Sequence, residues 1–165
     1  MKVLFISTLC TAYKGGGNIS SSLVASHLRE RGIEVETEFI RKEEPRTPLE
    51  RLLRVIPEGF FNTGAPFLDR LIARKIRQCI DRHRPDILDI QDRFSITAAS
   101  RIEDREVVKV FTVIDDLSRR QLEASHKSWR FFLLNIKRRS ILKRLKQERF
   151  IVANSRHTAR VLVEH

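Results

Sequence analysis

Three successive glycines, Gly15, Gly16 and Gly17, follow the first apolar run of the sequence. A backbone without Cβ atoms can approach a ligand closely, and the helix expected after the glycines offers free amide groups and a positive dipole end. Phosphate groups or sugar hydroxyls suit such a loop, and Asn18 is expected to cap the helix. Ser20 stands where the dinucleotide-binding fingerprint needs a third glycine, which disfavours NAD. A tight turn without a ligand would use the same glycines.

Charged residues follow three later strands of the expected sheet. Asp92 and Arg93 place a carboxylate beside a guanidinium, which can hold polyol or phosphate groups or form a surface ion pair. Asp115 and Asp116 could bind hydroxyl groups or bases, or serve as a helix N-cap with a solvated neighbour. Arg156, after the last strand, could reach an anionic ligand. These five side chains are candidates for binding, and none is assigned a catalytic role.

No metal site and no catalytic nucleophile are indicated. Cys10 and Cys79 have neither metal-like nor redox-like spacing, so both are expected to be free thiols. No Ser-His-Asp or Cys-His grouping can be defined from the order of residues. The histidines share no ligand spacing on a helix face; they are His27, His83, His126, His157 and His165. The catalytic residues are therefore unknown at this stage.

The elements that must position these residues alternate between strand and helix. Met1–Ser7 is expected to be a buried strand, because its apolar residues are consecutive, as in a sheet covered on both faces. Further strands are expected at Ile33–Ile40, Asp86–Gln91, Val107–Ile114 and Phe150–Ala153. This order predicts an α/β doubly wound parallel sheet in three layers, α/β/α, which binds ligands beyond the carboxyl ends of its strands. The loops there are Thr8–Asn18, Gln91–Ser95 and Asp115–Ser118.

Local signals set the boundaries of the helices. Gly32 is expected to end the first helix in a left-handed conformation, after apolar residues at helical spacing, Ile19, Leu23, Val24 and Leu28. A second amphipathic helix begins near Phe67 and must end before Pro85, because proline disfavours helical geometry in the preceding residue. A short helix at Ile96–Ile102, a long basic helix at Ser128–Gln147 and a last helix capped by Ser155 complete the order.

Two segments have a less regular pattern. Ile33–Ile40 alternates apolar residues with Glu34, Glu36 and Glu38, which predicts a strand with one solvated face. Residues 41–64 contain three prolines and paired aromatics, which indicate an excursion with a short helix of unpredicted shape.

The length and the amino-terminal residues suggest one domain in the cytoplasm. A chain of 165 residues can bury one continuous core, so residues 1–165 are expected to form a single domain. The first apolar run is too short to span a membrane and lacks the cleavage region of a signal peptide. Cytoplasmic residence is the expectation, with peripheral attachment to the inner face of the membrane as a variant of it.

The net charge of +11 is concentrated in one segment. Lys127–Arg149 holds nine basic residues and a single acid, Glu148, interleaved with apolar residues. Such a helix can lie on an anionic membrane surface, or its apolar stripe can pack on the sheet while the cations stay solvated. The membrane-surface candidates are Trp129, Arg130, Lys137, Arg138, Arg139, Lys143 and Arg144. Nucleic-acid binding is a weaker alternative, because no known nucleic-acid module accompanies the charge.

Five motifs together resemble the N-terminal domain of the family 4 retaining glycosyltransferases of GT-B architecture. They are KVLFIST, the glycine loop, RPDILDIQD, VVKVFTVIDD and FIVANSRHTARVLVE, in the order and spacing of that family. The resemblance spans essentially the whole chain. It implies a Rossmann-like domain that holds the acceptor and faces a second domain, which holds the nucleotide sugar across a cleft.

The resemblance also implies which residues face the cleft. It assigns Gly15, Gly16, Gly17 and, more cautiously, Asn18 to the donor phosphates and the reacting sugar, and it places Asp92, Arg93 and Asp115 along the cleft. Ile114 stands where the family commonly has a histidine, and isoleucine cannot hydrogen-bond a sugar hydroxyl.

The paired glutamates and the donor-binding surface of the family belong to the second domain, which this sequence does not include. The chain is thus expected to bind no cofactor itself and to be inactive without a donor-binding half. A non-catalytic partner subunit of a two-chain enzyme is the alternative.

Overall fold

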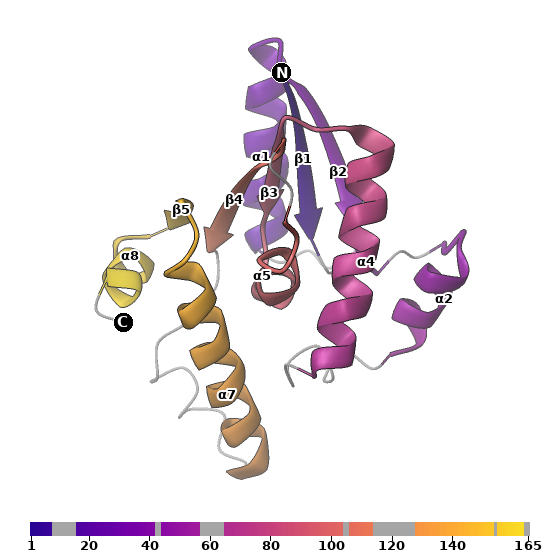
Figure 1. Ribbon diagram of the computed structural model, residues 1–165. Coiled ribbons are helices and arrows are strands. Elements are labelled where there is room, and N and C mark those ends of the chain that lie inside the picture. The colour runs from indigo at the N-terminus through magenta and orange to yellow at the C-terminus, as the bar shows by residue number, and fades with distance from the viewer. Residues whose placement is uncertain are drawn as a thin grey trace.

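The computed structural model describes residues 1–7, 16–41, 44–56, 65–103, 106–113, 128–153 and 155–163. Five parallel strands form one sheet in the order β2-β1-β3-β4-β5 (Figure 1). The strands are β1 (Lys2–Ser7), β2 (Glu34–Phe39), β3 (Ile87–Ile90), β4 (Val108–Val113) and β5 (Phe150–Ala153). The helices are α1 (Gly16–Glu30), α2 (Pro48–Val55), α4 (Pro66–His83), α5 (Arg93–Ala99), α7 (Ser128–Leu145) and α8 (Arg156–Val163). This arrangement confirms the predicted α/β doubly wound parallel sheet.

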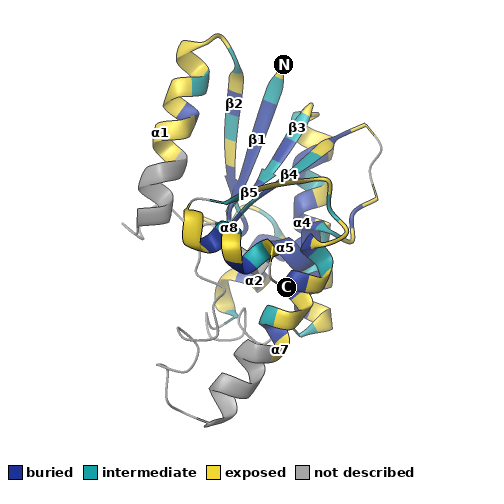
Figure 2. Ribbon diagram, turned by 90° about the vertical axis from the view of Figure 1, so that its left-hand side faces the viewer, coloured by how far each residue is buried: buried dark blue, intermediate teal, exposed yellow. Residues whose placement is uncertain are grey.

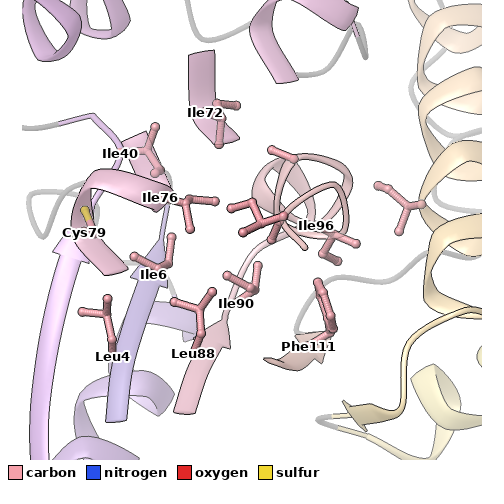
Figure 3. Close-up of a cluster of buried hydrophobic side chains, with 14 of the residues drawn as sticks. Leu4, Ile6, Ile40, Ile72, Ile76, Cys79, Leu88, Ile90, Ile96 and Phe111 are labelled. Carbon is pink, nitrogen blue, oxygen red and sulfur yellow. The ribbon is translucent and has the colours of Figure 1, made fainter. Parts of the chain in front are cut away.

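Helices lie on both faces of the sheet, and β1, between β2 and β3, is buried from both sides. Val3 and Phe5 pack with Ala25 of α1 and Val35 of β2 on one face, here called the α1 side. Alternate strand residues pack under α2, α4, α5 and α7 on the other face, the α4 side (Figure 3). Figure 2 shows α1 on one side of the sheet and α4 and α5 on the other. The consecutive apolar residues of β1 are explained by this burial from both sides.

The core of the α4 side is built from aliphatic side chains of the strands and of α4. Leu4, Ile6, Leu88 and Ile90 are fully buried there together with Ile72 and Ile76 of α4. Removing an apolar side chain from water stabilises a fold by about 1.5–3 kcal/mol when it is fully buried. The α4 side therefore supplies most of the hydrophobic stabilisation, and the helices on it are fixed relative to the strands.

Most predicted boundaries agree with the structure to within a few residues. Gly32 has a φ of +75°, which confirms the left-handed end of α1. The helix α4 ends at His83, two residues before Pro85, with Arg84 also left-handed at a φ of 45°. Ser155 caps α8 by accepting a hydrogen bond of 3.0 Å from the Thr158 amide.

Three predictions about local features are corrected. Asn18 is not an N-cap, because α1 already begins at Gly16. Leu23 and Val24 of α1 are 65% and 50% exposed, so the side of α1 that packs on the sheet is set by Ala25 and Leu28. The supposedly solvated face of β2 buries Glu38, whose Oε1 lies 3.0 Å from His83 Nε2.

The excursion after β2 is anchored by a buried ion pair. Glu50, in the first turn of α2, forms a capping box with Thr47: the Glu50 amide donates to Thr47 Oγ1 at 3.2 Å, and the Thr47 amide donates to Glu50 Oε2 at 3.0 Å. The other carboxylate oxygen accepts a hydrogen bond from Nζ of the fully buried Lys75 of α4. One glutamate thus starts α2 and fixes it to α4.

The charge of Glu50 depends on these partners. Burial raises the pKa of its carboxyl, but the hydrogen bonds from Lys75 and from the amides of Arg46 and Thr47 outweigh burial and lower the pKa to about 2. Because the folded-state pKa lies below the ordinary value of 4.5, the stabilisation is complete above that value and is lost as pH falls toward 2.

We predict that Glu50→Gln lowers the free energy of unfolding by about 3–5 kcal/mol at neutral pH, because it leaves the Lys75 ammonium buried without its counter-ion. Urea unfolding of the parent and the variant across the acidic range checks this, with the exposed Glu44→Gln as the matched control. The difference between parent and Glu50→Gln should shrink as pH falls. A difference independent of pH, or an equal loss in Glu44→Gln, would contradict the assignment.

Candidate functional site at the carboxyl edge

The carboxyl ends of all five strands lie at one edge of the sheet, because every strand is parallel (Figure 1). Backbone hydrogen bonds continue past the strands there: Gln91 N donates to Ile6 O at 3.0 Å, and Ile40 N donates to Ser7 O at 2.8 Å. Gln91, just after β3, and Ile40, just after β2, are therefore adjacent to the end of β1 at this edge. The expected ligand-binding position of a doubly wound sheet is the same edge.

Asp92 stands where β3 turns into α5, and it caps that helix. Its Oδ1 accepts a hydrogen bond of 2.9 Å from the amide of Ser95, and its Oδ2 accepts one of 3.2 Å from the Ser95 hydroxyl. Ser95 is fully buried, whereas Asp92 is half-buried. A carboxylate is an acceptor of the kind that binds the hydroxyl groups of a ligand.

A second carboxylate, Asp89, lies within β3 on the α1 side of the sheet. It accepts a hydrogen bond of 2.7 Å from Thr112 Oγ1 of β4 and one of 3.3 Å from Gln91 Nε2. Burial raises the pKa of the Asp89 carboxyl, and the two hydrogen bonds oppose this rise. Sequence reasoning missed this residue, although a carboxylate that interrupts an apolar strand was a visible signal.

A third polar group lies on the α4 side, where α4, α5 and α7 meet. Lys137 Nζ donates to Asp69 Oδ1 at 3.2 Å and to Thr97 Oγ1 at 2.8 Å, and the Thr97 hydroxyl donates to Asp69 Oδ1 at 3.0 Å. All three residues are buried. Burial lowers the pKa of Lys137, while the Asp69 carboxylate and the more distant Asp92 carboxylate raise it. Lys137 therefore links this group electrostatically to Asp92 at the carboxyl edge.

Lys137 was predicted as a membrane-surface cation, and this is wrong because only 4% of the residue is exposed. Ile141, Leu142 and Leu145 of α7 also face the core, so the apolar stripe of this helix packs on the domain. The exposed cations of α7 are Arg139 and Lys143, and Arg138 and Arg144 are half-buried. The side chains of Trp129 and Arg130 lie outside the described part of α7.

The structure describes only part of the predicted binding residues. Gly15, Ile114, Asp115 and Asp116 lie outside the described residues, and so do the side chains of Asn18 and Arg93. Gly16 and Gly17 form the first turn of α1, whose first amide groups have no partner within the helix. Arg156 is exposed at the start of α8, just after β5. In the sheet, β4 lies between β5 and β3.

Two further properties of the described residues concern metal ions and membranes. No three or more His, Cys, Asp or Glu side chains in the described segments are grouped so that they could hold a metal ion. None of the helices in those segments is long and apolar enough to cross a membrane. Cys79 is a buried cysteine of the α4 side.

We predict that Asp89→Asn makes the domain more stable than the parent at neutral pH. Because the folded-state pKa of Asp89 is raised, its contribution is fully present below the ordinary pKa of 3.8 and is lost as pH rises through the folded-state pKa. Asparagine keeps an acceptor for Thr112 and does not ionise.

Urea unfolding at acidic and neutral pH measures this difference, with Asp81→Asn on the exposed side of α4 as the control. The prediction fails if the free energy of unfolding has the same pH dependence in the parent and in Asp89→Asn. It also fails if Asp81→Asn gains as much stability as Asp89→Asn at neutral pH.

Comparison with known proteins assigns the chain to a family. The family model described as Glycosyltransferase Family 4 matches residues 14–165, which include the glycine loop, β3 with Asp92, and α8. No curated protein matches the chain. The five-stranded parallel sheet with helices on both faces is the arrangement expected of one half of a GT-B fold. The chain belongs to glycosyltransferase family 4, and its sequence and fold are those of the family's N-terminal domain.

Proposed function

We propose that this domain is the acceptor-side half of a glycosyltransferase that moves a sugar from a nucleotide-sugar donor to a carbohydrate, lipid or small-molecule acceptor. The observation that carries the proposal is the family match over residues 14–165, which covers α1 and every later element of the domain. Family membership supports a glycosyltransferase-type function in general. That this domain binds the acceptor, and that it needs a donor-binding half, are proposed in addition.

Two features of the carboxyl edge suit the reaction. The first turn of α1 begins with Gly16 and Gly17, so its free amides and dipole favour the phosphates of a nucleotide sugar. Asp92 caps α5 at the same edge, and a carboxylate there suits a sugar hydroxyl. Arg93, Asp115, Asp116 and Arg156 are proposed as further polar contacts of the cleft. No residue of this chain is proposed as the nucleophile.

The complete enzyme would need a second domain for the donor. That domain would supply the surface that binds the nucleotide and the paired glutamates, either in the same polypeptide or as a separate chain. The second arrangement makes this domain a non-catalytic partner subunit. The nucleotide sugar is a substrate of the complete enzyme, and we propose no cofactor on this half.

We predict that the domain alone transfers no sugar and that transfer appears when a donor-binding half of a family 4 enzyme is joined to it or added to it. Labelled uridine- and guanosine-diphosphate sugars are incubated with sugar acceptors and with lipid extracts, and the labelled product is counted. Asp92→Asn should lower kcat/KM for the acceptor by about 10- to 100-fold, because a hydrogen bond to a charged group is lost.

Asp81→Asn, on the far part of α4, is the matched control and should leave transfer unchanged. Transfer by the domain alone would contradict the need for a donor half. Equal effects of the two substitutions would contradict the placement of the acceptor beside Asp92.

We also propose that the exposed side of α7 attaches the domain to an anionic membrane, which would bring a lipid acceptor to the cleft. Arg139 and Lys143 are exposed on this helix, and the neighbouring Ile136 is 46% exposed. Cations near an anionic leaflet contribute about 1 kcal/mol each. Nucleic acid is a less favoured polyanion, because the domain's fold matches a sugar-transfer family.

We predict that Arg139→Ser with Lys143→Ser lowers the partition of the domain onto phosphatidylserine-containing vesicles by about 30-fold, the effect of two cations. Vesicle flotation measures the bound fraction. The control removes two exposed cations of α4, Arg74→Ser with Arg77→Ser, and should change the partition much less. Equal losses in the two double variants would contradict a specific role of α7.

A further inference from the structure

A buried polar junction joins three helices on the α4 side of the sheet. Asp69 comes from α4, Thr97 from α5 and Lys137 from α7, and each is at most 4% exposed. The Thr97 hydroxyl accepts a hydrogen bond from Lys137 and donates one to Asp69. The second oxygen of Asp69 lies 3.8 Å from Nη2 of Arg101, just beyond the end of α5. The junction therefore holds α5 near its middle and at its end.

The packing of α5 gives a reason for these directional contacts. The helix has seven residues, and its fully buried apolar side chains among the described residues are Ile96, Ala98 and Ala99. Two of these three end in a single methyl group, so apolar packing constrains the rotation and position of so short a helix mainly through Ile96. Hydrogen bonds and ion pairs require defined distances and angles, and buried polar groups can fix a unique arrangement in this way.

The site residue Asp92 depends on the position of α5. It accepts hydrogen bonds from the amide and the hydroxyl of Ser95, and Ser95 is two residues before Thr97 on the same helix. A shift or rotation of α5 would move Ser95 and with it the carboxylate. Lys137 lies close enough for Asp92 to raise its pKa, which places the junction and the cleft residue within electrostatic reach.

We propose that Asp69, Thr97 and Lys137 are positioning residues: they fix α5 against α4 and α7, and so hold Asp92 at the carboxyl edge of the sheet. The inference rests on the proposed function only in regarding that edge as the acceptor cleft. Its test measures how α5 is held and not sugar transfer. A failure of this inference can therefore be distinguished from a failure of the proposed function.

The first experiment is residue-resolved amide hydrogen exchange by NMR on the whole chain. Thr97→Val removes the hydroxyl at nearly constant volume, whereas Thr97→Ser keeps it. The double variant Asp69→Leu with Lys137→Met removes both charges, a change that often leaves stability unaltered. Lys143→Met, at an exposed position of α7, is the control.

We expect the Ser95 amide, which donates to Asp92, to exchange about tenfold faster or more in Thr97→Val and in the double variant. The amides of Leu4 and Leu88 in the core strands should stay within about twofold of the parent, and Thr97→Ser should restore Ser95 protection. A purely structural role would instead speed exchange at Ser95 and in the strands by the same factor. That outcome, or unchanged protection of Ser95, would overturn the proposal. If the double variant does not fold, the Thr97→Val and Thr97→Ser pair decides.

A second readout tests the link to the cleft directly. NMR titration of the Lys137 side chain should show that Asp92→Asn lowers its pKa further, because a nearby negative charge is removed. Asp81→Asn should leave the pKa of Lys137 unchanged. An equal pKa of Lys137 in the parent and in Asp92→Asn would overturn the proposed coupling between junction and cleft.

Discussion

Burial of β1 on both of its faces within an all-parallel sheet is the constraint on which the rest of this structure depends. β1 is covered by α1 on one side and by α4 on the other, and every strand pairing in the sheet is parallel, which requires a crossover connection between paired strands. Parallel pairing in turn brings all carboxyl ends to one edge. The candidate site is a consequence of this topology, because Gly16 after β1 and Asp92 after β3 are far apart in sequence and follow neighbouring strands in the sheet.

The α4 side adds a second layer of organisation through buried charges. Lys75 with Glu50 fixes α2, and Lys137 with Asp69 and Thr97 fixes α7 and α5. Neither lysine is part of a ligand-binding surface. Buried pairs of this kind add little net stability over apolar residues, but they specify which helix lies where. These contacts would determine the geometry of the acceptor cleft proposed at the carboxyl edge, because they hold α5, the helix that carries Ser95.

The order of the elements could be predicted from the sequence because it rests on local signals. The consecutive apolar residues of β1, the left-handed Gly32 and the position of Pro85 each act on their own part of the chain. The contacts between helices could not be predicted, because they depend on which residues face one another after folding. Lys137 was assigned to solvent by its neighbours in a basic helix, yet its partner Asp69 is 68 residues away. A charged residue within an apolar stripe, as Lys75 is in α4, is a sequence signal that predicts a buried partner of opposite charge. Asp92 could be predicted as a site residue from the sequence. Its role as a helix cap could not, because that role depends on where Ser95 lies in the folded chain.

The central claim is that this family 4 domain holds an acceptor at the carboxyl edge, opposite a donor-binding half. A crystal structure of the domain joined to a donor-binding half, with a nucleoside diphosphate and an acceptor sugar bound, tests it most directly. The account predicts that the acceptor lies within hydrogen-bonding distance of Asp92, and that the diphosphate faces the first turn of α1 at Gly16 and Gly17. An acceptor bound at the amino edge of the sheet, or on the donor half without contact to this domain, would contradict the account.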